Sequence, residues 1–543
     1  MVLGLSVLTA ESLHQPDHVK QDFNKLKDGF ANIGLELSLE KCKLFMPGGT
    51  EVECQQHAAE LGVTAIKPDE GLVVLGVPVG DDAWVEAELA RKADDFEEKL
   101  NRVRDSISTQ SLLLVLQSAQ SMFQHVVAAV KPALVEDLCQ RVDTACRAAF
   151  MDRIFKAKAH LLEEEAKDRR GQVMQYQNKV VTYRSLLQMR LEMPVKKGGL
   201  GVLSLVTRSK RAYLISTSKL KLDHEAVWAD FAASSLRDGY QAVLGELGWA
   251  NKTVKSVAGM DISSACGVVY KEFDTLLRSV GNASMVAAYC ASRQRGAGTF
   301  LTMRPVDKQR TLANEQAEFA ILQRMGIMSE RVLGIVGGSE CGYCGKAMSM
   351  AHVTSCSHFR SKRHDAIRDV LRNMVCSAGI GCQTEQQAVS SQQRVDLWTS
   401  NYTNPEMRPE KSWLGGDVTV VSPVDNHSKF NAKALERAAK DKTTKYTTGQ
   451  NNFSEEMHAV IVPLAMSTFG ALESNFHSFI AKTASLAIRT NRYMPGVDEY
   501  FIPKWKQIVA ATLIRAQAAA ARSVIVSAST GAVAVGLGAD VED

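Results

Sequence analysis

The 543-residue chain lacks features that would assign it to a class at once. Positive and negative charges are nearly balanced, with 64 Lys and Arg residues and 60 Asp and Glu residues. Composition alone therefore does not indicate nucleic-acid binding, although local basic patches can still bind it. The cysteines number 11, and this odd count of mostly scattered residues argues against a disulfide framework and favours an intracellular protein. With 45% hydrophobic residues, the chain is long enough for several domains.

The sequence also lacks a long uninterrupted apolar run. No stretch reaches 18 consecutive strongly apolar residues, and the opening MVLGLSVLTAESLH has no basic region of the kind that begins a signal peptide. The nearest membrane candidate, residues 523–539, is short and rich in Gly, Ser and Thr. We therefore expect no membrane partner, and we expect this last segment to be a frayed tail.

Helical periodicity dominates the first two thirds of the chain. Helices are predicted at 18–32, 84–107, 109–130 and 133–155, and over most of 206–335. The short connections between the second, third and fourth helices are typical of a helical bundle. Strand-like patterns occur at 35–45 and 71–80, and a loop with three glycines spans 194–205.

Strands and helices alternate in the last third. The runs RVDLWTS (394–400), GGDVTVVSP (415–423) and VIVPLAM (460–466) are of β type, with a helix at 433–446 between the second and third. This interleaving predicts a small α/β domain, followed by an Ala-rich helix at 503–524. The predicted fold class is therefore mixed and mostly α.

The stretch CGYCGKAMSMAHVTSCSHFRSKRHDAI, residues 341–367, carries metal-ligand spacing. Cys341 and Cys344 form a short clip, and Cys356 lies one helical turn beyond His352. Three Cys and one His suit a closed, structural zinc site. His358 is a competing fourth ligand, and the alternative is a set of buried thiols with unrelated surface histidines.

A basic helix follows this stretch. Arg360, Lys362 and Arg363 are predicted either to bind phosphate beside the zinc or to form an ordinary solvated helix face. His364, in the same helix, is predicted to lie on its surface or to face DNA.

Carboxylates beside the β-type runs suggest a second, harder metal site. Magnesium prefers oxygen ligands, and Asp396 and Asp417 each lie in or beside a β-type run. Glu385 is expected at a helix end upstream of them, and the candidate lysines are Lys440, Lys442 and Lys445. A lysine there could orient water or stabilise a phosphorane. The alternative is that Asp417 caps a turn and Lys442 is an exposed helix cation.

Across residues 15–485 the order of segments resembles the C-terminal part of a non-LTR retrotransposon polyprotein of the restriction-like-endonuclease type. IGLELSLEKCKLF resembles a reverse-transcriptase palm strand and VLGVPVG the primer grip. The segment TQSLLLVLQSAQSMFQHVVAAVKP resembles the thumb. LEMPVKKGGLGVLSLVTRSKRAYLIS is the most specific match, to the region after the thumb. The cysteine stretch resembles the zinc knuckle, and RVDLWT, GDVTVV and ALERAAKDKTTKY resemble the endonuclease.

This resemblance implies a domain organisation. The expected parts are a small α+β palm remnant at 1–83, a thumb and post-thumb region at 84–210, a helical linker at 211–335, a zinc knuckle and basic helix at 336–372, an α/β restriction-like endonuclease at 373–490, and a C-terminal helix with a flexible tail at 491–543.

The resemblance also implies residue roles. Asp396 and Asp417 would be magnesium ligands and Lys442 the catalytic lysine, with Lys445 as its alternate and Glu385 as an upstream carboxylate. The four residues Cys341, Cys344, His352 and Cys356 would hold structural zinc. DNA and RNA are the implied partners, and an intracellular, nuclear location follows from them.

Three departures from the family pattern bear on activity. Val395 replaces a proline before Asp396, and the His-x3-Cys spacing is one residue tighter than in some relatives. No Asp-Asp pair precedes Gly34, although two-metal polymerisation needs such carboxylates. Asp81 and Asp82 are adjacent but follow the primer-grip-like turn. We therefore expect no polymerase activity and interpret the chain as a truncated element or an incomplete gene model.

A DNA-nicking endonuclease with a nucleic-acid-binding zinc knuckle is the first functional prediction. A non-catalytic nucleic-acid-binding remnant and a zinc-containing interaction scaffold are the alternatives.

Overall fold

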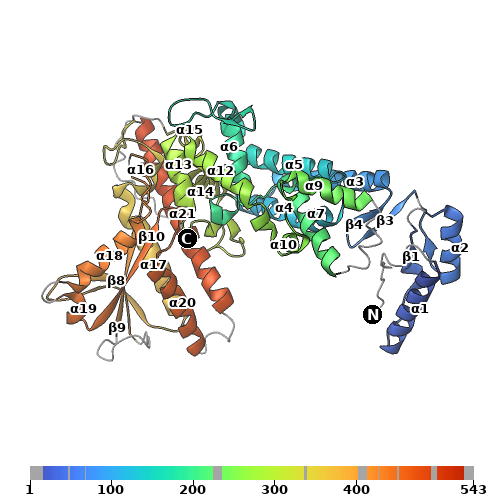
Figure 1. The fold of residues 1–543 in the computed structure, drawn as a ribbon. Coiled ribbons are helices and arrows are strands. Elements are labelled where there is room, and N and C mark those ends of the chain that lie inside the picture. Colours follow the sequence, from blue (N-terminus) through green and yellow to red (C-terminus); the bar gives the residue numbers. More distant parts are fainter. Residues whose placement is uncertain are drawn as a thin grey trace. The chain divides into compact units, whose positions relative to one another are not determined.

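The computed structural model describes residues 16–46, 49–67, 69–223, 235–335, 339–400, 413–425, 427–448, 452–490 and 498–530. Within these ranges the protein is mostly helical, with small sheets (Figure 1), as the sequence predicts. The chain divides into two compact units. The first comprises Met1–Ser106, Ser118–Ala149 and Ser204–Lys271, and the second Ile107–Gln117, Phe150–Leu203 and Glu272–Asp543.

The first unit begins with a small helical and strand subregion. Its elements are α1 (Pro16–Asn32), the 3-10 turn η2 (Leu39–Lys41), β1 (Lys43–Leu44), α2 (Glu51–Leu61) and β2 (Thr64–Ala65). The predicted helix at 18–32 is confirmed. The strand expected over 35–45 is wrong for most of its length, because the strand described there is limited to Lys43–Leu44, which pairs in parallel with the two-residue strand β2.

The stretch at 71–80 folds into a hairpin instead of the single strand expected. Strands β3 (Gly71–Val74) and β4 (Val77–Gly80) are antiparallel, and the loop residues Leu75 and Gly76 have φ of 50° and 86°. Two positive φ values in a two-residue loop match the right-handed twist of the strands. Asp81 then caps α3 (Asp82–Arg104) by accepting the Ala83 N–H at 2.9 Å, so this acidic pair serves the helix start.

Long helices form the rest of the first unit and continue into the second. The predicted helices are confirmed as α4 (Thr109–Ala129) and α5 (Glu136–Ile154), and the first unit also holds α7 (Leu205–Asp223), α9 (Ser235–Glu246), α10 (Val254–Ala258) and α11 (Ile262–Ala265). Asp143 of α5 is buried and accepts the N–H groups of Leu205 and Val206 at 2.9 and 3.1 Å. This carboxylate satisfies donors that the first turn of α7 leaves free.

Short helices make up most of the N-terminal part of the second unit, and some of them contact the glycine loop. They are η3 (Lys156–Glu163), α6 (Tyr183–Glu192), η4 (Val195–Lys197), α12 (Gly267–Ser279), α13 (Ala283–Ser292), η5 (Thr299–Thr302), α14 (Asn314–Met325) and α15 (Ser329–Leu333), with the hairpin β5 (Gln175–Tyr176) and β6 (Lys179–Val180). Buried Arg324 donates to the carbonyls of Val195, Gly199 and Ala297 at 2.8 to 3.1 Å. Gly198 and Gly201 have φ of 91° and 80°, as expected for a loop that needs glycine.

The C-terminal part of the second unit is the α/β module that the sequence predicts. Its elements are α16 (Met350–Ser355), η6 (Ser357–Phe359), α17 (Arg360–Ser377), β7 (Cys382–Gln387), β8 (Arg394–Ser400), β9 (Trp413–Val421), α18 (Ala434–Thr447), α19 (Phe453–Glu456), β10 (Ala459–Ser467), α20 (Ser474–Arg489) and α21 (Asp498–Thr530). The sheet order is β10-β9-β8-β7. β9 and β10 are parallel, and the other neighbours are antiparallel.

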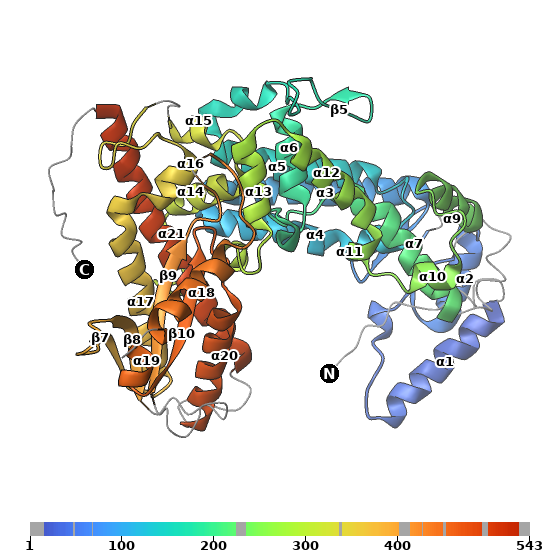
Figure 2. The ribbon, with the colours of Figure 1, turned by 60° about the vertical axis from the view of Figure 1, so that its left-hand side comes forward.

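Helices cover both faces of this sheet (Figure 1, Figure 2). Helices α17, α20 and α21 share a core with Leu397, Val418 and Leu464 on one face, while Tyr446 of α18 and Phe453 of α19 pack with strand residues on the other. Helix α21 starts before residue 503 and is longer than predicted; the tail expected at 531–543 lies outside the described residues.

Two helices, α4 and α21, are long and apolar enough by composition to cross a membrane. Only 41% and 56% of those stretches are buried inside the protein. Core helices of soluble proteins pass the same test, so the two helices are weak evidence for a membrane.

Candidate functional site

The four predicted zinc ligands converge. Sγ of Cys344 lies 3.5 Å from Nε2 of His352 and 3.9 Å from Sγ of Cys356, which lies 4.0 Å from Sγ of Cys341. All four ligand atoms are within 4.8 Å of one another, slightly wider than the 4 Å or so that zinc bond lengths imply. The group, called the Cys/His cluster below, can hold a metal ion such as zinc.

Local structure explains why the cluster forms. Gly345 takes φ of 66° and lets the chain turn back, so that Cys341 N–H bonds the Lys346 carbonyl at 2.9 Å. Ser349 caps α16 by accepting the His352 N–H at 3.1 Å, which places this histidine in the first turn. Burial lowers the pKa of His352 and so favours the neutral ring that a metal requires.

His358 does not belong to the cluster. Its exposed ring stacks on Tyr343, with ring centroids 4.5 Å apart and an interplanar angle of 23°. The cluster instead packs its apolar side against α21, through Ala520, Ala521 and Val524. A side chain on Gly342 would meet Ser527 of α21 at 3.0 Å, so the two segments touch closely.

The basic helix is only partly the exposed surface that was expected. Arg360 and Lys362 are exposed. Arg363 is buried and donates from Nη2 to the Cys356 carbonyl at 3.1 Å, so the prediction that it is a surface phosphate ligand does not fit its place in the fold. Helical geometry turns Arg363, the fourth residue of α17, inward against the Cys/His cluster.

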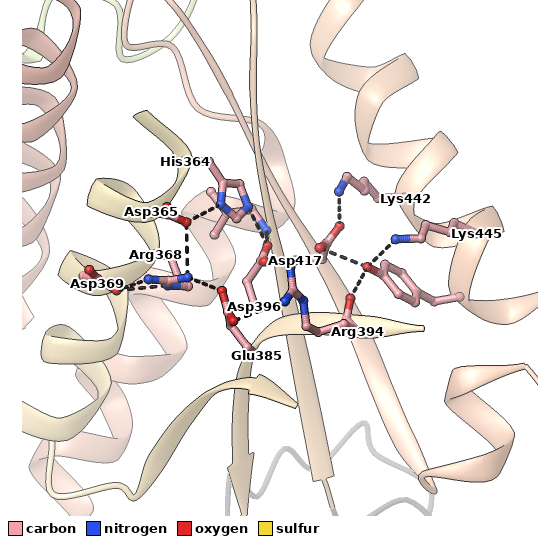
Figure 3. A network of polar contacts seen from close by, with 12 residues as sticks. His364, Asp365, Arg368, Asp369, Glu385, Arg394, Asp396, Asp417, Lys442 and Lys445 are labelled. Atoms are coloured by element: carbon pink, nitrogen blue, oxygen red, sulfur yellow. Dashed lines mark hydrogen bonds and ion pairs between the residues drawn. The ribbon is translucent and has the colours of Figure 1, made fainter. Parts of the chain in front are cut away.

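Asp396 and Asp417 lie on the two inner strands of the sheet, at the point where the pairing of β8 with β9 ends. Leu397 of β8 and Gly416 of β9 are the last pair, and the next residue of each strand beyond it is an aspartate. Both side chains are buried, with residue exposures of 7% and 2%. Figure 3 shows the two carboxylates between α17 and α18.

Two donors hold one oxygen of Asp396. Its Oδ2 accepts the Val418 N–H at 2.6 Å and lies 3.0 Å from Nε2 of His364, which projects from α17. His364 is therefore half-buried against the carboxylates and lines the cavity, so of the two expected places the open helix surface is wrong, while contact with DNA stays a prediction. Burial alone would raise the pKa of Asp396, but His364 and the Val418 N–H outweigh it and hold this pKa below its usual range.

Asp417 is held from the opposite side by α18. Nζ of Lys442 lies 2.6 Å from Oδ2, and the Tyr446 hydroxyl donates to Oδ1 at 3.1 Å. Oδ2 receives no well-directed hydrogen bond within the described chain, so its contact with Lys442 is an ion pair. Burial and the charge of Asp396 raise the pKa of Asp417 to about 6, although Lys442 opposes the shift.

Other predicted site residues take different places. Glu385 lies in β7, at a φ of 60°, and not at a helix end. Its carboxylate pairs with Arg368 at 2.5 Å and Arg394 at 3.2 Å, so both of its oxygens are engaged. Lys445 contacts the Tyr446 hydroxyl at 2.9 Å and is not part of the ion pair between Lys442 and Asp417. Lys440 is exposed on α18.

The carboxylates open into a cavity of about 700 Å³. Its polar lining includes cations from three elements, namely Arg360 of α17, Arg394 of β8 and Lys442 and Lys445 of α18. A buried acidic pair within a ring of cations can hold a divalent cation and an anionic ligand together.

The histidine at this site was missed at the sequence level. His364 lies 32 residues before Asp396, and no periodicity links the two. The available signal was its neighbour Asp365, because a carboxylate beside an imidazole often orients it toward a further partner.

Compared with models of known protein families and with curated proteins, the chain matches none of them.

Proposed function

We propose that the α/β module is a magnesium-dependent endonuclease that nicks one strand of DNA. The observation that supports this most is the meeting of Asp396, Asp417 and Lys442 in one cationic cavity. Two carboxylates and a lysine on adjacent elements are the groups that metal-assisted phosphodiester hydrolysis needs.

The residues present fit a magnesium ion. Oδ2 of Asp417 is buried without a well-directed donor, and the bonds from Val418 and His364 engage only Oδ2 of Asp396. The carboxylate oxygens that these hydrogen bonds leave free, Oδ1 of Asp396 and Oδ2 of Asp417, would therefore hold the cation. A magnesium ion bound there supplies Lewis-acid polarisation of a phosphoryl oxygen and lowers the pKa of bound water.

The other side chains of the cavity act on the substrate. Lys442 is close enough to Asp417 to offset negative charge that develops on a phosphate bound at the carboxylates. Arg360, which is exposed at the start of α17, would bind a neighbouring phosphate of the strand. The Tyr446 hydroxyl contacts both the Arg394 carbonyl, at 2.6 Å, and Oδ1 of Asp417. It therefore links the Asp417 side chain to the backbone of β8.

We further propose that the whole chain derives from a non-LTR retroelement. In this proposal the helices of the first unit bind RNA or DNA, the Cys/His cluster is a structural zinc knuckle beside the nuclease, and the protein works in the nucleus. The supporting features are the arrangement of the α/β module and the motifs quoted from the sequence.

The direct test is nicking of supercoiled plasmid by the full chain with magnesium. Wild-type protein should convert supercoiled to open-circular DNA, and Asp417→Ala should abolish this conversion while leaving DNA binding largely intact. Asp441→Ala is the matched control, since Asp441 is exposed on the same helix. Equal nicking by wild type and Asp417→Ala would assign the activity elsewhere or to a contaminant.

One observation favours a non-catalytic, nucleic-acid-binding role as the second candidate. The cavity holds two further carboxylates. Asp365 is engaged by His364 and Arg368, and Glu385 by Arg368 and Arg394, which leaves Asp396 and Asp417 for metal. Under this alternative the chain binds DNA with a strong salt dependence but does not nick it.

A further inference from the structure

His364 joins the carboxylates to a second network on α17. Its Nε2 faces Oδ2 of Asp396 at 3.0 Å, and its Nδ1 lies 3.3 Å from Oδ1 of Asp365 (Figure 3). Both ring nitrogens thus face carboxylates, which restricts the rotation of the imidazole.

Asp365 is itself held in place. Arg368 contacts it at 3.2 Å and contacts Glu385 of β7 at 2.5 Å, and Glu385 also pairs with Arg394 of β8 at 3.2 Å. The chain of contacts therefore runs from β8 through β7 and α17 and returns to β8 at Asp396. This closed series of contacts orients the imidazole of His364 through its Nδ1, on the side away from Asp396.

The start of α17 is tied down on its other side. Arg363, the residue before His364, is buried and donates to the carbonyl of Cys356, a member of the Cys/His cluster, at 3.1 Å. Successive residues of the first helical turns thus face the cluster and the carboxylates. The position of His364 depends on both attachments.

The geometry points to His364 as a positioning residue that holds Oδ2 of Asp396 and leaves Oδ1 for a divalent cation shared with Asp417. This inference rests on the proposed function, because it assigns a role within the same carboxylate pair. His364 acts through Asp396 and does not itself contact the metal. Outer partners of this kind typically change metal affinity by about 10- to 100-fold when they are removed.

A purely structural role for His364 makes a different prediction. In that case its removal would loosen α17 and lower the melting temperature without a specific effect on metal binding. Gln and Asn replacements separate the two roles. Gln places an amide donor near the position of Nε2, whereas Asn is too short to reach Asp396.

The experiment measures Mn2+ binding to the purified, zinc-containing full chain by calorimetry and by electron paramagnetic resonance. The variants are His364→Ala, His364→Asn, His364→Gln, Asp417→Ala as the site-null reference, and His427→Ala as an exposed histidine control. We expect His364→Ala and His364→Asn to weaken Mn2+ binding by about 10- to 100-fold. His364→Gln should recover most of this loss, and His427→Ala should match wild type.

Three results would overturn the inference. The first is Mn2+ affinity in His364→Ala equal to wild type. The second is an imidazole ¹⁴N coupling to Mn2+ that disappears in His364→Ala, since this would make His364 a ligand. The third is absence of wild-type Mn2+ binding. If instead His364-dependent Mn2+ binding occurs without plasmid nicking, positioning stands and the proposed nuclease activity fails.

Discussion

The backbone N–H of Val418 donates to Oδ2 of Asp396 at 2.6 Å, which ties one aspartate to the strand that carries the other. Because Val418 directly follows Asp417, this bond fixes the Asp396 carboxylate to the backbone beside Asp417, while Lys442 and Tyr446 hold the Asp417 carboxylate. A site built this way is preorganised for a shared cation.

Lys442 should contribute to the rate of nicking. Lys442→Met removes the charge 2.6 Å from Asp417 and should slow nicking by about 10²-fold or more, by analogy with loss of a transition-state donor. Lys440→Met is the matched control, because Lys440 is exposed on the same helix. The measurement is the rate of plasmid conversion at saturating magnesium. Equal rates in the two variants would remove Lys442 from the mechanism.

The Cys/His cluster should bind one zinc ion per chain. Metal analysis of purified protein should show this stoichiometry, and Cys341→Ala should lose the zinc and melt at a lower temperature. Cys376→Ala should keep it, since Cys376 is exposed and lies outside the cluster. Zinc retained in full by Cys341→Ala would contradict the ligand set.

Removing the charge of Asp417 should stabilise the protein at high pH. Its pKa is raised to about 6 by burial and by Asp396, so the folded state binds this proton more tightly than the unfolded state. This tighter proton binding adds on the order of 2–3 kcal/mol to the free energy of unfolding below about pH 4, and the contribution is lost as the pH rises through about 6.

Asp417→Asn should therefore unfold at higher denaturant concentration than wild type at pH 8, and the difference should shrink toward pH 4. Chemical denaturation in magnesium-free buffer at several pH values measures it. A constant difference across this pH range would show that Asp417 does not titrate as described.

Arg360 and Lys362 should affect DNA binding in different ways. Each substitution to Ala should lower the salt slope of DNA affinity by about 1, because one phosphate contact is lost. Only Arg360 lines the cavity, so Arg360→Ala should also slow nicking at saturating DNA. Filter binding at several salt concentrations, with plasmid nicking, tests both. Unchanged slopes in both variants would exclude the basic helix as a DNA contact.

Polymerase activity should be absent. The adjacent pair that follows the primer-grip-like turn, Asp81 and Asp82, is used at the start of α3, where Asp81 caps the helix and Asp82 pairs with Lys131 at 3.0 Å. Primer extension on an RNA template with magnesium should give no product above background. Extended product would reveal a carboxylate pair that serves polymerisation elsewhere in the chain.

Local spacing predicted the Cys/His cluster well. Cys341 and Cys344 are joined by one tight turn, and His352 and Cys356 by one helical turn, so sequence distance and spatial distance agree. Helices with strong periodicity, such as α3, α4 and α5, were predicted for the same reason.

Contacts between distant segments were not predictable in this way. The inward turn of Arg363, the approach of His364 to Asp396 and the pairing of Glu385 depend on how α17 packs against β7 and β8. Most of the strand expected at 35–45 did not form for a related reason, because alternation predicts a strand only as far as a partner strand runs beside it, and β2 pairs with Lys43 and Leu44.

The packing of α21 on the Cys/His cluster has a consequence for synthesis of the protein. Cys341 and Val524 share one apolar core, although more than 180 residues separate them in the sequence. During translation the cluster can gather its ligands as soon as Cys356 leaves the ribosome, but its apolar side stays uncovered until α21 has emerged. At about 5–20 residues per second, that interval lasts on the order of ten seconds or more, and the half-built module is open to chaperones for that time.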